Sequence, residues 1–294
     1  MEEQEWLARR FEAERARLRS VASRMLGSLG EADDALQEAW LRLSRSDTSG
    51  VQNPGGWLTA VVARVCLDML RSRKAWRKEP LGAHVPDPIV SREQDGIDPE
   101  QEAMLADSVG LALLVVLQTL TPAERLAFVL HDMFSVPFEE IAPIVGRSPV
   151  AARQLASRAR QRVRGAVTPP VADLSRQREV VDAFFAASRE GDFHTLLTLL
   201  DPGVVLRADR GVAPAGASRV VRGAPAVAQQ ALTFSRFAPF ARPALVNGAA
   251  GVVVAPGGRP FSVMGFTLTR GKIVGIDILA DPARLSRLDL AALD

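Results

Sequence analysis

Apolar positions recur every three and four residues through the first half of the chain, which is the spacing of amphipathic helices. Up to residue 76 they predict three helices. The first ends near Leu26, the second covers 32–43 and the third covers 57–73. A polar loop, 44–56, separates the last two. The spacing therefore predicts a helical bundle over residues 1–76.

A linker follows, because prolines and charges interrupt every apolar period over residues 77–103. Helical spacing returns over 104–167 and contains helix start signals in close succession. Thr121-Pro122-Ala123-Glu124 is a capping box with proline at the first helical position. Ser135 is expected to cap the next helix, whose first turn holds two glutamates. These signals predict short, well-delimited helices.

Gly146 ends that second helix, and Arg147-Ser148-Pro149 repeats the pattern of a serine cap followed by proline. Pro143 lies inside the helix near its end, so a bend is expected there and not loss of the helix. Two helices joined by a short glycine turn, the second carrying the charge, are typical of a DNA-reading helix-turn-helix.

The last of these helices combines a small apolar face with a basic one. Its apolar face is expected to pack against Ile141 and Val145 and consists of Ala152, Ala156, Ala159 and Val163. No carboxylate lies between Arg147 and Arg164. A solvated basic face is the alternative interpretation, but solvated helices usually mix both signs of charge. Contact with nucleic acid is therefore favoured.

Strand-like alternation appears in the last third of the chain. Beyond Thr168-Pro169-Pro170, a helix over 174–189 and a short partner over 192–200 come first. The expected strands then cover 204–208, 244–247, 251–255, 261–269 and 273–279. Arg270-Gly271-Lys272 is expected to form a hairpin turn between the last two strands. Helices followed by a run of antiparallel strands predict an α+β domain.

Composition sharpens this picture. The net charge is only +2 although the isoelectric point is near 9.2, so the basic character is local and steering would come from patches. The single cysteine, Cys66, excludes a disulfide framework and a cysteine-based metal site, and it is expected in a core. No signal peptide or membrane-length apolar run is present, which favours a cytoplasmic protein.

Residues 1–166 resemble the extracytoplasmic-function (ECF) sigma factors of bacterial RNA polymerase. Gly30–Leu43 is similar to their region 2 helix that grips the polymerase clamp. Pro54–Lys74 is similar to the segment that opens and reads the −10 promoter element, and Leu120–Arg164 is similar to region 4, which reads the −35 element. The resemblance implies two all-α sigma domains, a region 2 bundle over 1–76 and a region 4 helix-turn-helix over 104–167.

Residues 174–294 resemble the SnoaL-like α+β cone domains, and this fusion resembles the sigma-J-like group of ECF factors. The group has a proline-acid-proline linker motif, to which His84-Val85-Pro86-Asp87-Pro88 is similar, with histidine where an aromatic is usual. Asp209-Arg210-Gly211-Val212 keeps part of its Asp-Gly-Gly-Gly loop. Asp281-Pro282-Ala283-Arg284-Leu285 keeps the shape of its Asn-Pro-Asp-Lys-Leu motif. The resemblance assigns regulatory interdomain contacts to Pro86, Asp87, Pro88, Asp209, Gly211, Asp281, Pro282 and Leu285.

The chemistry of promoter opening, together with the resemblance, assigns three further sets of residues. Contacts to −35 DNA are expected from Arg147, Ser148, Arg153, Gln154, Ser157, Arg158 and Arg160, with Arg162 and Arg164 as further phosphate contacts. Contacts to the −10 element are expected from Asn53, Trp57, Arg64, Arg71, Arg73 and Lys74, with a flipped base held near the 46–53 loop. Contacts to the clamp of the largest polymerase subunits are expected from Asp33, Asp34, Gln37, Glu38 and Trp40.

Two of these assignments compete with simpler interpretations. Trp57 opens an apolar helix, and a tryptophan there is more often part of a core than a base-stacking group. Acids in a first helical turn, such as Asp33 and Asp34, complement the helix dipole without any partner.

The tail offers three candidate catalytic residues, but no acid–base pair at diagnostic spacing. They are His194, expected on the surface, Asp209, and Asp277, expected to face away from its apolar neighbours in the last strand. No enzyme activity, cofactor or metal is therefore predicted, and regulation in cis is favoured over catalysis. A small apolar ligand in the tail, and a helix-turn-helix regulator that acts without polymerase, stay open as alternatives. Any anti-sigma partner is unknown.

Overall fold

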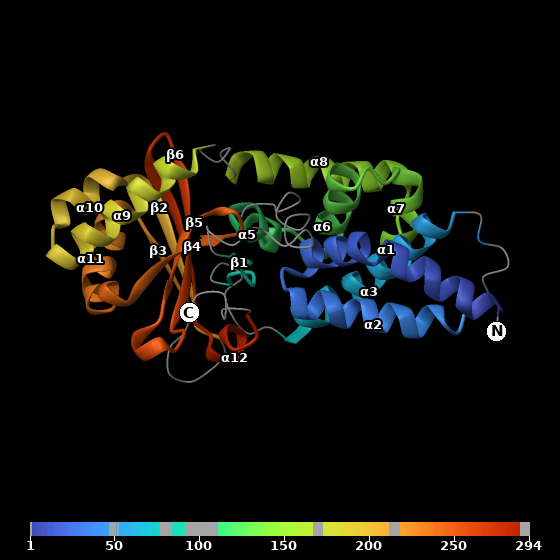
Figure 1. Ribbon diagram of the computed structural model, residues 1–294. Coiled ribbons are helices and arrows are strands. Elements are labelled where there is room, and N and C mark those ends of the chain that lie inside the picture. The colour runs from blue at the N-terminus through green and yellow to red at the C-terminus, as the bar shows by residue number, and fades with distance from the viewer. Residues whose placement is uncertain are drawn as a thin grey trace. The chain divides into compact units, whose positions relative to one another are not determined.

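A computed structural model describes residues 2–46, 51, 53–76, 84–91, 111–166, 173–211 and 218–288. The chain divides into two compact units (Figure 1). The first combines Met1–Glu79 with Val116–Ala166, and the second combines Pro80–Val115 with Val167–Asp294. Each unit therefore takes its residues from two separate stretches of sequence.

Three helices open the first unit, as the apolar spacing predicts. They are α1 (Glu2–Leu26), α2 (Leu29–Leu43) and α3 (Pro54–Trp76). Ser28 caps α2 by accepting a hydrogen bond from the Glu31 amide at 3.3 Å. The three helices pack around the core with fully buried leucines, Met25 and Cys66. Cys66 is fully buried, so its predicted place in a core is confirmed, and this burial raises the pKa of its thiol to about 12.

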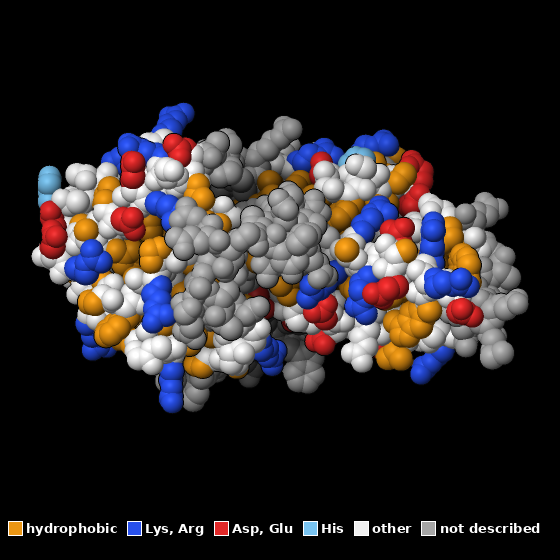
Figure 2. All heavy atoms as spheres, viewed as in Figure 1, with side chains coloured by type: hydrophobic (Ala, Val, Ile, Leu, Met, Phe, Trp, Pro, Cys, Tyr) orange, Lys and Arg blue, Asp and Glu red, His pale blue; other side chains and the backbone are white. Residues whose placement is uncertain are grey.

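The rest of the first unit is a chain of helices that begins within α5 (Leu111–Thr119), at Val116. It continues with α6 (Pro122–Phe128), the π-helical turn η1 (Val129–Met133), α7 (Phe138–Val145) and α8 (Pro149–Ala166). The capping box at Thr121 and Glu124 is present, with both reciprocal hydrogen bonds. Gly146 adopts the left-handed conformation at the C-terminus of α7, where glycine has no steric penalty. On the face seen in Figure 2, basic and acidic side chains are interspersed over this unit.

The expected cap at Ser135 is wrong. Ser135 has a positive φ of 56°, and its amide donates to the His131 carbonyl, so it turns the chain before the helix begins. The N-cap of α7 is Pro137, which makes no side-chain cap bond. Its fixed φ directs the chain into the helix without a capping hydroxyl. Pro143 does not end α7, which continues to Val145, as predicted.

The second unit is an α+β domain. Its two leading helices are α9 (Leu174–Glu190) and α10 (Phe193–Leu199). The described strands form a seven-stranded sheet in the order β1-β4-β5-β6-β7-β2-β3. Their bounds are β1 (Val90–Ser91), β2 (Leu200–Asp209), β3 (Arg219–Arg222), β4 (Ala241–Val246), β5 (Ala249–Val254), β6 (Ser262–Thr269) and β7 (Lys272–Leu279). Shorter elements are α11 (Ala224–Thr233), η2 (Ser235–Phe240), η3 (Pro256–Gly258) and α12 (Pro282–Leu285).

The predicted hairpin between the last two strands is present, with positive φ at both Arg270 and Gly271. A purely antiparallel run is wrong, however, because β2 pairs with β7 in parallel. Strand β2, the first long strand along the chain, lies beside β7, the last one, and the order of strands in the sequence does not predict this neighbour. Elements β1, β3 and α11 were also missed by the sequence pattern. Two of these are too short to show a period, with two residues in β1 and four in β3.

Strand alternation gives the sheet two differently covered faces. Helices α9, α10 and α11 cover one face (Figure 1), over a core that includes Phe184, Phe266 and Ile276. The other face carries a smaller core, in which Val85 and Leu285 pack against strand residues such as Val263. The predicted cone of helices on a sheet is therefore confirmed, and linker residues belong to its second face.

Candidate functional sites

Helix α8 presents a basic face outward and a small face inward. Ala152, Ala156 and Ala159 have no exposed surface, as predicted, and α8 packs on α6 and α7 through this face. Alanine allows two helices to approach closely, so α8 is held in a fixed rotation about its own axis. Of the seven residues predicted to contact −35 DNA, Ser157 and Arg160 are half-buried and five are exposed, namely Arg147, Ser148, Arg153, Gln154 and Arg158.

The arginines of α8 fall into two groups. Arg160 Nε lies 2.5 Å from Asp132 Oδ1, and Arg162 Nη1 lies 2.6 Å from Glu124 Oε2. These two arginines therefore form ion pairs between α8 and the neighbouring elements η1 and α6. Arg153 and Arg158 have no carboxylate partner among the described residues and stay exposed. The side chain of Arg164 lies outside the described part of the chain.

The buried Glu124 carboxylate anchors Arg162. Burial raises the pKa of Glu124, but hydrogen bonds from Thr121 and the contact with Arg162 outweigh this effect. The net result is a pKa below its ordinary value, so the carboxylate is ionised at neutral pH. Arg162 thus has a charged partner within the fold.

Val150 is an additional exposed residue of α8 that the sequence pattern did not single out. Its side chain is 62% exposed, one helical turn before Gln154. An exposed apolar group on a basic helix suits contact with a thymine methyl. Sequence reasoning missed it because apolar residues were assigned to the inner face.

The predicted polymerase contacts lie along α2. Asp34, Gln37 and Glu38 are exposed, whereas Trp40 is half-buried with its ring 5.3 Å from that of Phe11. Two of the acids pair within the bundle. Asp33 accepts from Arg19 at 2.7 and 2.8 Å, and Glu38 accepts from Arg42 at 2.8 Å. A cavity of about 380 Å³ opens between α1 and α2, lined by Ala8, Phe11, Glu12, Arg15, Asp33, Leu36, Gln37 and Trp40.

The predicted −10 contacts lie on and before α3. Asn53 Oδ1 accepts from the Gly56 amide at 3.1 Å, so this side chain caps the helix. Trp57 is half-buried, and Arg64 contacts the Pro143 carbonyl at 3.4 Å. Arg71 is exposed. The side chains of Arg73 and Lys74, and most of the 46–53 loop, lie outside the described residues.

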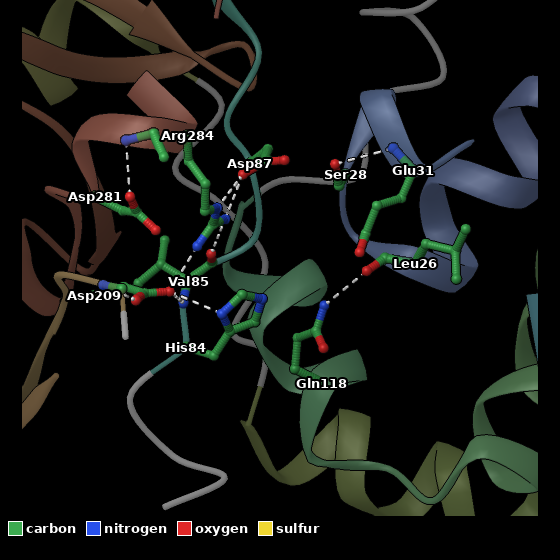
Figure 3. Close-up of polar contacts among 12 residues, drawn as sticks. Leu26, Ser28, Glu31, His84, Val85, Asp87, Gln118, Asp209, Asp281 and Arg284 are labelled. Carbon is green, nitrogen blue, oxygen red and sulfur yellow. Dashed lines mark hydrogen bonds and ion pairs between the residues drawn. The ribbon is translucent and has the colours of Figure 1, made fainter. Parts of the chain in front are cut away.

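A buried arginine joins the two halves of the first unit. Arg125 is 3% exposed and donates to the Met25 carbonyl at 2.8 Å and to Gln118 Oε1 at 3.0 Å. Gln118 in turn donates to the Leu26 carbonyl at 3.4 Å (Figure 3). These are end carbonyls of α1, which have no partner within their own helix. No sequence signal identified Arg125, because the Met25 carbonyl that it binds is 100 residues away along the chain.

Residues 84–91 of the linker lie along the tail as an extended segment. Strand β1 pairs with β4 in antiparallel fashion. The Ile89 amide donates to Asn247 Oδ1 at 2.8 Å, and the Asn247 amide donates back to the Ile89 carbonyl at 2.8 Å. Val85 is 1% exposed within the smaller core. The linker is therefore held by backbone pairing and by burial of an apolar side chain.

Asp209 and Arg284 form the polar centre of this contact (Figure 3). Asp209 Oδ2 lies 2.8 Å from His84 Nδ1 and accepts from the Val85 amide at 3.0 Å and from Arg284 at 2.7 Å. Arg284 also contacts Asp87 at 2.6 Å and the Val85 carbonyl at 2.6 Å. The negative charge of Asp209 is thus paired with His84 and the Val85 amide of the linker, and the positive charge of Arg284 is paired with the linker residue Asp87.

These partners lower the pKa of Asp209. Burial raises it, but His84, the Val85 amide and Arg284 together outweigh burial and hold the pKa well below its ordinary value. The other carboxylate oxygen accepts from the Gly211 amide at 3.1 Å and from Ser218 Oγ at 3.2 Å. The Asp209 carboxylate is consequently charged and fully hydrogen-bonded.

Gly211 and Asp281 meet beside this centre. Gly211 has φ +72°, and a Cβ placed on it would lie 2.3 Å from Asp281 Oδ2, so only glycine fits. Asp281 caps α12 through the Ala283 amide at 2.9 Å, with Pro282 next in the helix. Leu285 is buried in the smaller core. Asp87, Asp209, Gly211, Asp281 and Leu285 of the predicted interdomain set thus lie close together, and Pro86 and Pro88 are buried in the adjoining linker segment. Arg284, for which the sequence motif predicted no contact, lies at their centre.

Acid is expected to weaken this centre. A depressed folded pKa contributes stability that is complete above the unfolded value, near 3.8, and is lost as pH falls through the folded value. Asp209→Asn should therefore destabilise the protein fully at pH 7 and measurably less at about pH 3, where the unfolded carboxyl is mostly protonated but the folded one is still charged. Urea unfolding of the variant and the parent at both pH values measures this difference. Asp182→Asn, an exposed change on α9, serves as the control, and an equal destabilisation at both pH values would contradict the prediction.

The opposite face of the tail sheet contains a cavity of about 590 Å³ beneath α9, α11 and η2. Its described lining holds no carboxylate and no imidazole. Ala208 and Arg210 line it, whereas Asp209 between them contacts the linker. The C-terminal end of β2 therefore contributes residues both to the cavity and to the contact with the linker.

The three candidate catalytic residues lie outside this cavity. His194 is exposed, as predicted. Asp277 faces away from its apolar neighbours, also as predicted, and lies 3.1 Å from Arg207. Burial raises the pKa of Asp277, which Arg207 only partly offsets. No group of three metal-ligating side chains occurs in the described parts of the chain.

Comparison with known proteins matches both sigma regions. Residues 10–76 match the Sigma-70 region 2 model, and residues 110–163 match the Sigma-70 region 4 model. Among the described residues, no helix is long and apolar enough to cross a membrane.

Full-length relatives extend the match to the tail. The ECF RNA polymerase sigma factor SigJ of Mycobacterium tuberculosis is 40% identical, over 94% of this chain and 92% of that protein. A probable ECF sigma factor of the same species, SigI, is 35% identical, over 95% of this chain and 94% of that protein. The crystal structure of M. tuberculosis SigJ superposes with a TM-score of 0.74 and 37% identity, covering 95% of this chain and 98% of that one. The chain belongs to the extracytoplasmic-function family of RNA polymerase sigma factors.

Proposed function

We propose that this sigma factor reads the −35 element with α8, contacts the −10 element with α3 and binds the polymerase clamp with the acidic face of α2. As a member of its family it is a non-enzymatic initiation factor that directs RNA polymerase to promoters. The observation that carries the assignment is the pair of faces on α8, one buried and alanine-rich, the other exposed and basic. Because polymerase and promoter DNA are its partners, we expect the protein to act in the cytoplasm.

Base reading is assigned to the exposed residues near the start of α8. Arg153, Gln154 and Val150 project from a helix whose other face is fixed by packing. Arginine suits guanine, glutamine suits adenine and an apolar side chain suits the thymine methyl. Phosphate contact is assigned to Arg147 and Arg158, because they lack a carboxylate partner among the described residues.

Gln154→Ala is expected to lower promoter-dependent run-off transcription about tenfold at subsaturating DNA, since one base contact is worth about 1–3 kcal/mol. The loss should be confined to promoters with the native base at one −35 position. Arg189→Ala, an exposed arginine of α9, is the matched surface control. A uniform loss on every −35 sequence would assign Gln154 to phosphate contact instead.

Clamp binding is assigned to α2, where Asp34 is exposed and has no ion-pair partner among the described residues. Asp34→Lys is expected to weaken binding of core RNA polymerase about tenfold, because reversing a charge at a complementary interface adds repulsion. Fluorescence anisotropy of labelled protein against core enzyme measures this change. Asp182→Lys is the control, and equal affinities for the parent and both variants would reject the α2 assignment.

We further propose that the tail regulates the sigma domains in cis through the linker. Within the first unit, α3 contacts α7, for example through Arg64 and the Pro143 carbonyl. The two promoter elements are about 25 base pairs apart, which is about 85 Å of duplex. The two DNA-binding helices must therefore separate when both elements are bound. The linker between them is fastened to the tail at residues 84–91, which supports a tail-controlled separation.

Run-off transcription with core enzyme tests this regulation. A chain truncated after Thr168 should bind core polymerase normally but differ from the full-length chain in promoter-dependent transcription, because its linker has lost the tail sheet. Indistinguishable transcription across graded truncations would reject regulation by the tail.

A second role is proposed for the tail, namely binding of a small, mainly apolar ligand. The support is a cavity of about 590 Å³, within the size range of small-molecule sites, lined largely by phenylalanine and aliphatic side chains.

A further inference from the structure

We propose that the tail cavity binds an amphipathic carboxylate, with its apolar body inside and its carboxylate against Arg210 and Arg219. The inference rests on the proposed ligand-binding role of the tail and specifies the chemistry of the ligand. Nothing in the sigma-factor function requires a basic group at this place, because the cavity lies on the sheet face opposite to the linker contact.

The inner part of the cavity is apolar and rigid. Phe184, Phe185 and Ile276 are buried residues of the main core, and their packed side chains form part of the lining. Phe184 and Phe185 also make edge-on contacts with Phe266, which fixes their orientation. A wall of this kind stabilises hydrocarbon or aromatic groups and offers no hydrogen bond to a polar body.

Two arginines give the cavity a basic region. Ala208 and Arg219 are directly paired between β2 and β3, so their side chains share one face of the sheet. Arg210 lies two residues beyond Ala208, and all three line the cavity. Arg210 follows the end of β2 and Arg219 begins β3, so both arginines enter the cavity from the same edge of the sheet.

The charges of these arginines have no carboxylate partner among the described residues. The Arg210 guanidinium lies 5.6 Å from the centre of the Phe234 ring, and Arg219 donates to Gln230 Oε1 at 3.2 Å. Both neighbours are neutral, and the described lining contains no acid. The site therefore favours an anion and disfavours a cation.

The hydroxyl groups of Ser218 and Thr233, which also line the cavity, are not available as donors to an anion. Ser218 Oγ already donates to Asp209, and Thr233 Oγ1 donates to the Gln229 carbonyl at 2.8 Å. The guanidinium N–H groups of Arg210 and Arg219 that Gln230 does not use remain as donors. Two such groups side by side match the two oxygens of one planar carboxylate.

Calorimetric titration of the full-length protein with decanoate, decan-1-ol and decylammonium tests the proposal. Decanoate should bind at least tenfold tighter than the other two, and its affinity should fall with added salt. The double variant Arg210→Gln/Arg219→Gln should lose about tenfold for decanoate and nothing for decanol. Arg222→Gln, an exposed arginine of β3 outside the lining, should behave as the parent.

A cavity-filling variant locates the site. Ala231 lines the cavity and is half-buried, so Ala231→Phe should abolish binding of decanoate and decanol while circular dichroism stays unchanged. Decanoate binding that persists in this folded variant would overturn the location.

Equal binding of decanoate and decanol, both insensitive to the arginine changes, would overturn the carboxylate inference while leaving an apolar ligand site intact. Tighter binding of decylammonium would also overturn it. Absence of binding for all three probes would reject the carboxylate and the proposed ligand role together. None of these three results would affect the sigma-factor assignment, which the transcription assay measures separately.

Discussion

Replacing Arg284 with alanine is expected to release residues 84–91 from the tail and to destabilise the second unit by about 3–5 kcal/mol. Arg284 contacts Asp87, Asp209 and the Val85 carbonyl at once, and Asp209 is almost wholly buried. Without the arginine, Asp87 and Asp209 each lose a positively charged partner. Hydrogen exchange should accelerate at the Val85 and Ile89 amides, which donate to Asp209 and Asn247.

Arg287→Ala provides the matched control, because Arg287 follows one turn later and is exposed. It should leave exchange in the linker and the unfolding midpoint unchanged. If Arg284→Ala lowers stability but keeps both linker amides protected, the linker is held by β1 pairing and Val85 burial alone. That result would contradict the assigned role of the ionic centre.

Replacing Arg125 with methionine is expected to destabilise the first unit by about 3 kcal/mol. The methionine fills a similar volume but leaves the Met25 carbonyl and Gln118 Oε1 without their buried donor. The guanidinium also places a positive charge at the C-terminus of α1, where the helix dipole favours it. Thermal and urea unfolding measured by tryptophan fluorescence reports this unit directly, because all four tryptophans lie within residues 1–76.

Arg158→Met is the control for that change, being exposed and without an ion pair in the described part of the chain. It should leave the unfolding midpoint within experimental error of the parent. An equal midpoint for Arg125→Met would show that water replaces the buried guanidinium at no cost. The role assigned to Arg125 in joining α1 to α6 would then be wrong.

Both residues connect segments that lie far apart in sequence, and they explain how the chain forms two discontinuous units. Arg125 joins helices on either side of the linker, and Arg284 joins the linker to the last helix of the tail. A change in the tail centre therefore acts on the one segment that covalently connects the two DNA-binding regions. This provides a physical basis for the proposed regulation in cis.

The sequence predicted most elements because their signals are local. The capping box at Thr121 and Glu124, the glycine stop at Gly146 and the hairpin at Arg270 and Gly271 each depend on a few neighbouring residues. The alanine face of α8 also follows from helical spacing alone. The cap at Ser135 failed although it is local, because a proline two residues later and a left-handed turn compete for the same start.

The sequence predicted some residues of the candidate sites and not their partners, again because it carries only local signals. Exposed positions of α2 and α8 follow from the helical period, so their assignment needed no tertiary structure. The pairing of Arg160 with Asp132 and of Arg162 with Glu124 was not predictable, since each partner lies on another helix. The parallel pairing of β2 with β7 was equally hidden, because a sheet joins strands regardless of their order along the chain.

By itself, the sequence determined the position of most helices and long strands, which face of each is apolar, and that α8 is basic without acids. Those properties depend on periodicity and capping within a few residues. Only the tertiary structure decided which charged side chains bind partners inside the fold and which remain without an ion-pair partner among the described residues. Arg125, Asp209 and Arg284 are occupied by distant partners, whereas Arg153, Arg210 and Arg219 are not ion-paired within the described residues. The physical reason is that a hydrogen bond or an ion pair depends on distance in space, which folding sets across separations of up to 199 residues.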